Sequence, residues 1–216
     1  MNVATVKDPV SGFSHLAGLG LALLGVPCLL LFAYARRDTG ALVTSLAYGA
    51  SLIVLYAASS AYHLVVAGER VSQRLRLLDH SAIFLLIAGT CTPFFHRAFE
   101  GRTRLVMMSL VWVLALAGIG LQLAWRRAPR LLYTALYVAM GWLVVVRWSD
   151  VVHRLPASAL ALVVAGGITY TLGAIVYASK RPDPFPRVFG FHEIWHLFVL
   201  AGSALHFAGV VALART

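Results

Sequence analysis

Four ionisable side chains lie inside or at the edges of strongly apolar stretches of the 216-residue sequence: His63, Asp79, His192 and His196. Ionisable groups are costly within a lipid bilayer, so such residues are candidates for function. His192 and His196 are four residues apart, which places both imidazoles on one face of a helix. With His63 from a second helix they would form a three-histidine zinc site with water as the fourth ligand. Zinc lowers the pKa of such a water to about 7 and so supplies hydroxide at neutral pH.

Two further roles in such a site are those of a general base and a hydrogen-bond donor. Asp79 could act as the general base for the water, or orient it through a hydrogen bond. Ser59 precedes His63 by four residues and shares its helix face, so it could donate to a substrate carbonyl oxygen or hold a ligand in place. Simpler roles stay open, because Asp79 could pair with Arg76 and Ser59 could serve helix packing.

The segment His192-Glu193-Ile194-Trp195-His196 also fits the H-E-x-x-H pattern of zinc proteases, in which the glutamate is the general base. An intramembrane protease of this kind would need an acidic third ligand on a later helix. Only 20 residues follow His196, and none of them is acidic. The sequence therefore favours a structural role for Glu193 over a catalytic one. It would lie in the first turn of a helix, where the helix dipole stabilises a negative charge.

Three other histidines bear on the site. His15 and His80 fall in or near the same layer, so we expect them to support the site without binding the metal. His80 follows Asp79 directly and points about 100° away on a helix, so both cannot face one metal squarely. His206 lies roughly 15 Å along the helix beyond His196 and cannot join the same metal. The sequence leaves open whether His206 lines a cavity or bonds a neighbouring helix.

The apolar segments that must position these residues account for most of the chain. Hydrophobic residues make up 60% of the sequence and charged residues only 12%, against about 45–50% and about 25% in soluble domains. Disorder and a soluble globule are both disfavoured. Seven windows have the length and apolarity of a transmembrane helix, at 12–34, 42–66, 77–96, 105–125, 131–147, 156–179 and 191–213. The sequence predicts an all-α polytopic membrane protein, with residues 1–216 forming a single seven-helix domain.

The alternating helix order brings the candidate residues together. The end of the second helix and the starts of the third and seventh lie on the same side of the membrane, whichever way the chain is inserted. With the N-terminus inside, ten of the 18 lysines and arginines lie on the inner side and eight on the outer side. The positive-inside rule therefore slightly favours an N-in, C-out orientation.

The net charge of +10 would suggest a nucleic-acid partner in a soluble chain. Here the charges lie in short gaps between apolar blocks, so we expect them to meet anionic lipid head groups, with no nucleic-acid partner. The two cysteines, Cys28 and Cys91, lie within apolar blocks. They indicate neither a disulfide framework nor a thiolate metal site.

Three ordered motifs carry a resemblance to a known family. Ser59-Ser60-Ala61-Tyr62-His63 fits a Ser-x-x-x-His motif, and residues 78–94 and 192–207 closely resemble the third-helix and seventh-helix signatures of the haemolysin III family. That family belongs with the progestin and adiponectin receptors, and the wider group includes the alkaline ceramidases. Cys91 departs from the pattern, in which tyrosine is expected. It lies about 18 Å along the helix from Asp79, so the site should not depend on it.

The resemblance implies zinc bound by His63, His192 and His196, with Asp79 beside the zinc-bound water and Ser59 near the metal. It also implies an N-in topology in the bacterial inner (plasma) membrane, with the site toward the cytoplasm. Related members hydrolyse amide bonds of lipids such as ceramide.

Three functions follow for consideration. The first is a zinc-dependent, ceramidase-like hydrolase that acts on an amide or ester of a membrane lipid. The second is a non-enzymatic sensor or a pore-forming haemolysin, in which zinc would be structural. The third is an intramembrane metalloprotease. Neither the lipid substrate nor the oligomeric state can be read from the residues.

Overall fold

The computed structural model describes residues 6–125, 128–186 and 188–215. Within these ranges the regular structure is helical, and the only β-type pairing is an isolated bridge between Phe185 and Phe189. The helices are α1 (Pro9–Ala35), α2 (Thr39–Leu64), α3 (Glu69–Ala98), α4 (Gly101–Ala124), α5 (Arg130–Gly141), η1 (Trp142–Arg147), α6 (Trp148–Arg154), α7 (Ala157–Ser179) and α8 (Phe191–Arg215).

The described residues contain seven helical spans that are long and apolar enough to cross a membrane. Helices α1, α2, α3, α4, α7 and α8 each form one span, and α5, η1 and α6 together form the fifth. The predicted all-α, seven-helix membrane architecture is therefore confirmed, and the chain is an integral membrane protein. A bilayer favours such a bundle because helices satisfy their backbone hydrogen bonds internally.

Two predicted helix boundaries were wrong. The third helix begins at Glu69, about two turns before the predicted start at residue 77, and the fifth span continues to Arg154, beyond the predicted end at residue 147. The extra turns of α3 are polar and rich in arginine and glutamine, which have high helix propensity, whereas those of the fifth span mix polar and apolar residues. A hydropathy window detects only the apolar part of such a helix.

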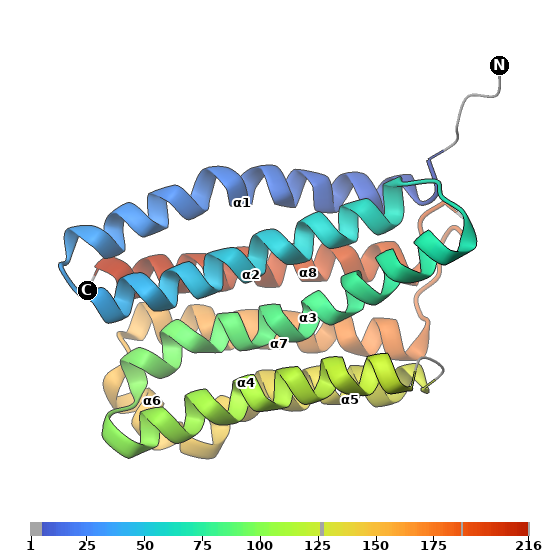
Figure 1. Cartoon of the computed structure of the whole chain (residues 1–216). Helices are drawn as coiled ribbons and strands as arrows, with labels where there is room; N and C mark the ends of the chain where they lie inside the picture. Colours follow the sequence, from blue (N-terminus) through green and yellow to red (C-terminus); the bar gives the residue numbers. More distant parts are fainter. Residues whose placement is uncertain (1–5, 126–127, 187, 216) are drawn as a thin grey trace.

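The helices pack in an order that places α3 and α8 against several neighbours. Helix α2 packs between α1 and α3, α8 packs on α7 and α1, and α3 also contacts α4, α5 and α8 (Figure 1). Figure 1 shows that the start of α1, the end of α2 and the starts of α3 and α8 lie at one end of the bundle, while the C-terminus lies at the other. This end is referred to below as the N-terminal end.

Glycines allow the closest helix approaches, as is common in membranes. A Cβ atom at Gly89 of α3 would overlap the side chain of Ser51 of α2, and one at Gly118 of α4 would overlap the ring of Phe84. Ser51 cannot easily move away, because its hydroxyl donates to the carbonyl oxygen of Tyr48 at 2.7 Å. These contacts fix α3 between α2 and α4.

Gly89→Ala should therefore lower the thermal unfolding midpoint of the protein in detergent, because overpacking of this kind costs about 1–3 kcal/mol. Gly120→Ala is a matched control, since a Cβ atom there meets no atom within 4 Å. Alanine favours a helix by about 1 kcal/mol over glycine, so the control should unfold at the same temperature or slightly higher. Equal midpoints for the two variants would contradict the close α2–α3 contact.

Candidate functional site

Three histidine rings converge at the N-terminal end of the bundle. His63 lies in the last turn of α2, and His192 and His196 lie in the first two turns of α8. One ring nitrogen from each lies within 4.8 Å of those of the other two, and the Nε2 atoms of His192 and His196 are 3.2 Å apart. Within the described ranges this is the one group of three or more His, Cys, Asp or Glu side chains close enough to hold a metal ion.

The chemistry of these rings fits a metal ion. Nε2 of His63 is buried and has no hydrogen-bond partner in the described structure. A buried polar atom without a partner costs about 1–3 kcal/mol, so such atoms usually mark a bound ligand or a functional site. Neutral imidazole nitrogens are suitable ligands for a divalent transition metal. The three rings can therefore bind one such ion between α2 and α8.

Helix α1 covers this cluster through one of its faces. Asp8 Oδ2 accepts a hydrogen bond from Nδ1 of His63 at 3.0 Å. One turn along, the Ser11 hydroxyl donates to Oε1 of Glu193 at 3.1 Å. After one more turn the ring of His15 lies 4.0 Å from that of His196, centroid to centroid. Residues 8, 11 and 15 share a helix face, so α1 contacts the end of α2 and the start of α8 together.

Asp8 was not among the site residues predicted from the sequence. It directly precedes Pro9 at the start of α1, where an aspartate normally caps the helix, but its side chain forms no capping hydrogen bond. Its carboxylate instead contacts His63, and its backbone N–H donates to the carbonyl oxygen of the same residue at 2.9 Å. A carboxylate that binds the second nitrogen of a metal-binding histidine fixes its tautomer and orientation.

Asp79 and Ser59 face each other across the α2–α3 contact. Both side chains are buried. Among the described residues Asp79 forms no ion pair within 4.0 Å, so the suggested pairing with Arg76 is absent. Asp79 and Ser59 line the same cavity as His192 and His196.

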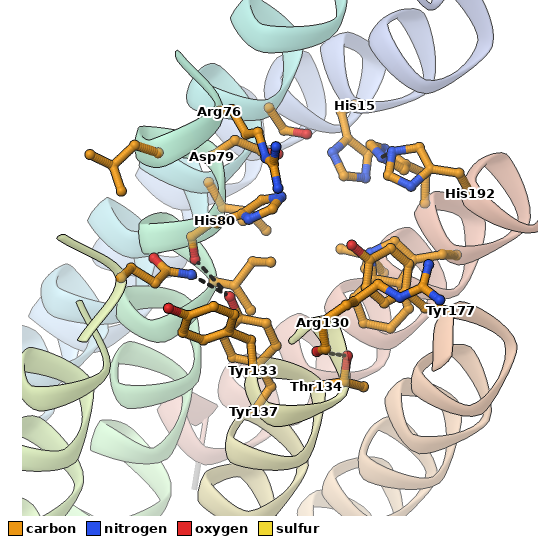
Figure 2. Close-up of a pocket in the computed structure, with 18 of the residues that line it drawn as sticks. His15, Arg76, Asp79, His80, Arg130, Tyr133, Thr134, Tyr137, Tyr177 and His192 are labelled. Atoms are coloured by element: carbon orange, nitrogen blue, oxygen red, sulfur yellow. Dashed lines mark hydrogen bonds between the residues drawn. The ribbon is translucent and has the colours of Figure 1, made fainter. Parts of the chain in front are cut away.

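This cavity has a volume of about 760 Å³ and opens among α2, α3, α5, α7 and α8. Figure 2 shows His15 and His192 on one side of it, Arg76, Asp79 and His80 on a second side, and Tyr133 and Tyr137 across from them. His15 and His80 both line this cavity, and neither belongs to the three-histidine group.

A chain of hydrogen bonds that was not predicted from the sequence joins α3, α4 and α5 at the wall of this cavity. Ser81 of α3 donates to the side-chain oxygen of Gln122 at 3.1 Å, and the Gln122 amide donates to the Tyr137 hydroxyl at 2.9 Å. Tyr137 in turn donates to the carbonyl oxygen of His80 at 3.1 Å. Gln122 is a polar amide within an apolar segment, and it is buried. Its position in that segment could have marked it in the sequence as a candidate for the site.

Glu193 and His206 have structural partners. Besides contacting Ser11, Glu193 accepts a hydrogen bond on Oε2 from the backbone N–H of Gly190 at 2.8 Å, the reciprocal contact of a capping box. Each carboxylate oxygen of Glu193 therefore accepts one hydrogen bond from a structural partner. Nε2 of His206 donates to the carbonyl oxygen of Val163 on α7 at 3.1 Å, and its ring packs on Gly166.

A second, apolar cavity of about 120 Å³ lies deeper between α3, α5, α7 and α8. Its walls share Ile83, Tyr137 and Trp195 with the first cavity, and it reaches Phe94 and His206. His206 therefore both lines a cavity and bonds a neighbouring helix. The two cavities together extend from the histidine cluster toward the middle of the bundle.

The fold and the cluster define a class of protein: an integral membrane bundle of seven helical spans with three histidines gathered at one end. Comparison with known families identifies its family. The model of the family described as "Haemolysin-III related" matches residues 3–207, and the chain belongs to the haemolysin III family. The resemblance stated from the three motifs is confirmed.

Similar proteins occur in bacteria, animals and plants. The chain is 36% identical to "Hemolysin-3" of Bacillus cereus over 94% of its own length and 90% of the relative's. It is 25% identical to "Monocyte to macrophage differentiation factor" of Homo sapiens, over 88% and 79% of the two lengths. It is also 30% identical to "Heptahelical transmembrane protein ADIPOR2" of Oryza sativa subsp. japonica, over 76% and 78%. These relatives connect the family with adiponectin-receptor-like proteins.

We expect the purified protein to bind about one zinc ion per chain through the three-histidine cluster. His196→Ala should abolish stoichiometric binding, whereas His206→Gln should retain it, because His206 lies outside the cluster on the same helix. Elemental analysis after zinc loading and removal of excess metal measures the ratio. Equal zinc content in the two variants would show that the cluster is not the binding site.

Asp8→Asn should weaken zinc binding by about 10–100-fold, the usual effect of losing a partner that orients a ligand. The matched control is Asp150→Asn, because Asp150 pairs with Arg147 toward the opposite end of the bundle. A competitive titration against a zinc-binding dye measures both affinities. An unchanged affinity in Asp8→Asn would rule out a role for its carboxylate in holding His63.

Proposed function

We propose that this haemolysin III family member is a zinc-dependent integral membrane hydrolase that cleaves an amide or ester bond of a lipid. The observation that carries the proposal is the position of two histidines of the cluster, His192 and His196, and the buried carboxylate of Asp79 on one cavity that continues into an apolar one. Three imidazoles without a fourth protein ligand in the described group match catalytic zinc sites, which keep one position open.

The candidate residues would have distinct roles in this reaction. His63, His192 and His196 would hold zinc, which when bound supplies a Lewis acid and activates water. Asp79 would accept the proton of the attacking water on its carboxylate and return it to the leaving amine or alcohol. Asp8 would keep Nδ1 of His63 protonated, which leaves Nε2 free to bind the metal.

Ser59 would position Asp79. A hydroxyl has one proton to donate, so a Ser59 hydroxyl that donates to Asp79 cannot also donate to a substrate carbonyl oxygen. Ser59 and Asp79 are both buried and line the same cavity, which supports the positioning role beside the oxyanion role that the sequence also suggested.

The cavities support a lipid as the substrate. The first cavity is lined by polar and charged side chains, whereas the second is lined mainly by apolar ones from α3, α5, α7 and α8. An amphiphile could place its carbonyl group beside the histidine cluster and its acyl chain in the apolar space. Pockets that combine an apolar body with a few convergent polar groups are typical of ligand sites.

We place the site on the cytoplasmic side of the bacterial plasma membrane. The small excess of positive charge on that side of the sequence supports an N-in, C-out orientation. The relatives from Bacillus cereus and Bacillus subtilis support a bacterial location.

The other two functions have less support. An intramembrane protease of the H-E-x-x-H type needs an acidic third ligand, but the candidate metal group of the described residues consists of three histidines. A pore needs polar groups through the full membrane depth, but the deeper cavity is walled mainly by side chains such as Phe94 and Leu86.

Asp79→Asn should reduce lipid hydrolysis by about 10²–10⁴-fold, the usual contribution of a general base, while the zinc content stays unchanged. The assay measures fatty-acid release from bacterial polar lipids and from ceramide by the zinc-loaded protein. Glu193→Gln is the matched control and should retain most of the activity. Unchanged release by Asp79→Asn would exclude the base role, and complete loss in Glu193→Gln would favour the protease.

A further inference from the structure

We infer that the lipid held in this cavity carries a phosphate head group, which arginines at the cavity mouth bind. The inference deepens the proposed function, on which its identification of a substrate rests. It also makes a statement about binding that can be tested without turnover. The phosphate would serve only for binding and would not be cleaved, whereas the amide or ester bond near the histidines would be cleaved.

The charge of the cavity wall is the first support. Four arginines line the 760 Å³ cavity, namely Arg70, Arg74, Arg76 and Arg130, and Asp79 is the single acidic residue among its lining residues. Among the described residues none of the four arginines has a carboxylate within 4.0 Å. The wall is therefore strongly positive and lacks a counterion from the protein, which complements an anionic ligand.

The direction of two arginines is the second support. Basic residues that only anchor a membrane helix turn outward to the head groups of the surrounding bilayer. Figure 2 instead shows Arg76 and Arg130 at the cavity, Arg76 above His80 and Arg130 beside Tyr177. Arg76 lies one turn before Asp79 and His80, so it shares the cavity face of α3 with them.

Arg130 is also held in position. One of its Nη atoms donates to the carbonyl oxygen of Ala178 at 3.3 Å, and the guanidinium lies 5.0 Å from the ring centroid of Tyr177 and 5.6 Å from that of Phe191. A guanidinium has five N–H groups, so most of them stay available to a ligand. A planar guanidinium fixed against aromatic rings is well suited to bidentate binding of phosphate.

The order of groups along the cavity points to a lipid phosphate. The arginines, His192, His196 and Asp79 line the polar cavity at the N-terminal end of the bundle, and the apolar cavity continues from it toward Phe94 and His206. A single-chain or double-chain phospholipid presents phosphate, acyl carbonyl and hydrocarbon in the same order. A neutral lipid would leave the guanidinium groups without an anion, and free phosphate would leave the apolar cavity unused.

The test uses the zinc-loaded full-length protein in detergent and two fluorescent probes with the same acyl chain, one a lysophosphatidic acid and the other a monoacylglycerol. We expect the phosphate probe to bind about tenfold or more tightly, as charge-assisted hydrogen bonds imply. Arg76→Gln and Arg130→Gln should remove most of this difference without changing binding of the neutral probe. Arg102→Gln, an exposed arginine at the other end of the bundle, should leave it unchanged.

Two controls and a competition experiment accompany these variants. Zinc content equal to that of the unmodified protein shows that each variant is folded, and Arg76→Lys should restore part of the preference because it keeps the charge. Inorganic phosphate should displace the probe only at far higher concentrations than unlabelled lysophosphatidic acid. Displacement at similar concentrations would identify free phosphate as the ligand and overturn the inference, as would equal binding of the two probes.

Failure of this inference can be separated from failure of the proposed function. Fatty-acid release from both phospholipids and neutral lipids, with the release from phospholipids unchanged in the arginine variants, would overturn the phosphate site and retain the hydrolase. Preferential binding of the phosphate probe, with no fatty-acid release from any lipid, would retain the phosphate site and overturn the hydrolase.

Discussion

The ring nitrogens of the histidine cluster are the constraint on which the rest of the site depends. Burying such groups in a bilayer protein is unfavourable unless something satisfies them, and the chain gathers three rings where one metal ion could do so. The surrounding contacts hold these rings in place. Asp8, at the start of α1, accepts a hydrogen bond from the ring of His63. Glu193 caps the start of α8, the helix that carries the other two rings. Three helices are therefore joined at a point that apolar packing alone would not specify.

The position of the cluster along the membrane axis is equally constrained. A hydrolase within a bilayer must bring water, a lipid carbonyl and a proton acceptor together, and water is scarce in the hydrocarbon. The three rings lie in the last turn of α2 and the first turns of α8, so they are near the end of the bundle that faces water. Asp79, two to three turns into α3, is at a similar level because α3 begins early, at Glu69.

Much of this arrangement could be predicted from the sequence. The spacing of His192 and His196 fixed their common helix face, and the alternation of seven spans placed them beside His63 whatever the insertion direction. Asp8 could not be found in this way, because its contact with His63 depends on where the start of α1 lies relative to the end of α2. The hydrogen-bonded chain through Gln122 also joins helices whose mutual rotation leaves no periodic signal. The extra turns of α3 and α6 were missed because hydropathy reports the surrounding solvent and not the helix itself.

Because the chain contains few charged residues, the arginines that line the cavity indicate a role in ligand binding. With so few charged residues, most arginines and lysines are needed at helix ends, where they meet the head groups of the bilayer. Arg130 begins α5 and Arg76 lies about two turns into α3, and both line a cavity that contains His192 and His196 and continues into an apolar space. The same residues can therefore anchor the bundle and select what enters it. In a membrane, the head group of a lipid is already near the level of the arginines. One contact with the phosphate would therefore both select the lipid and set how deeply it enters the cavity. If the phosphate is held there, the next groups along the molecule fall at the level of Asp79 and the histidines, where the proposed chemistry requires the carbonyl.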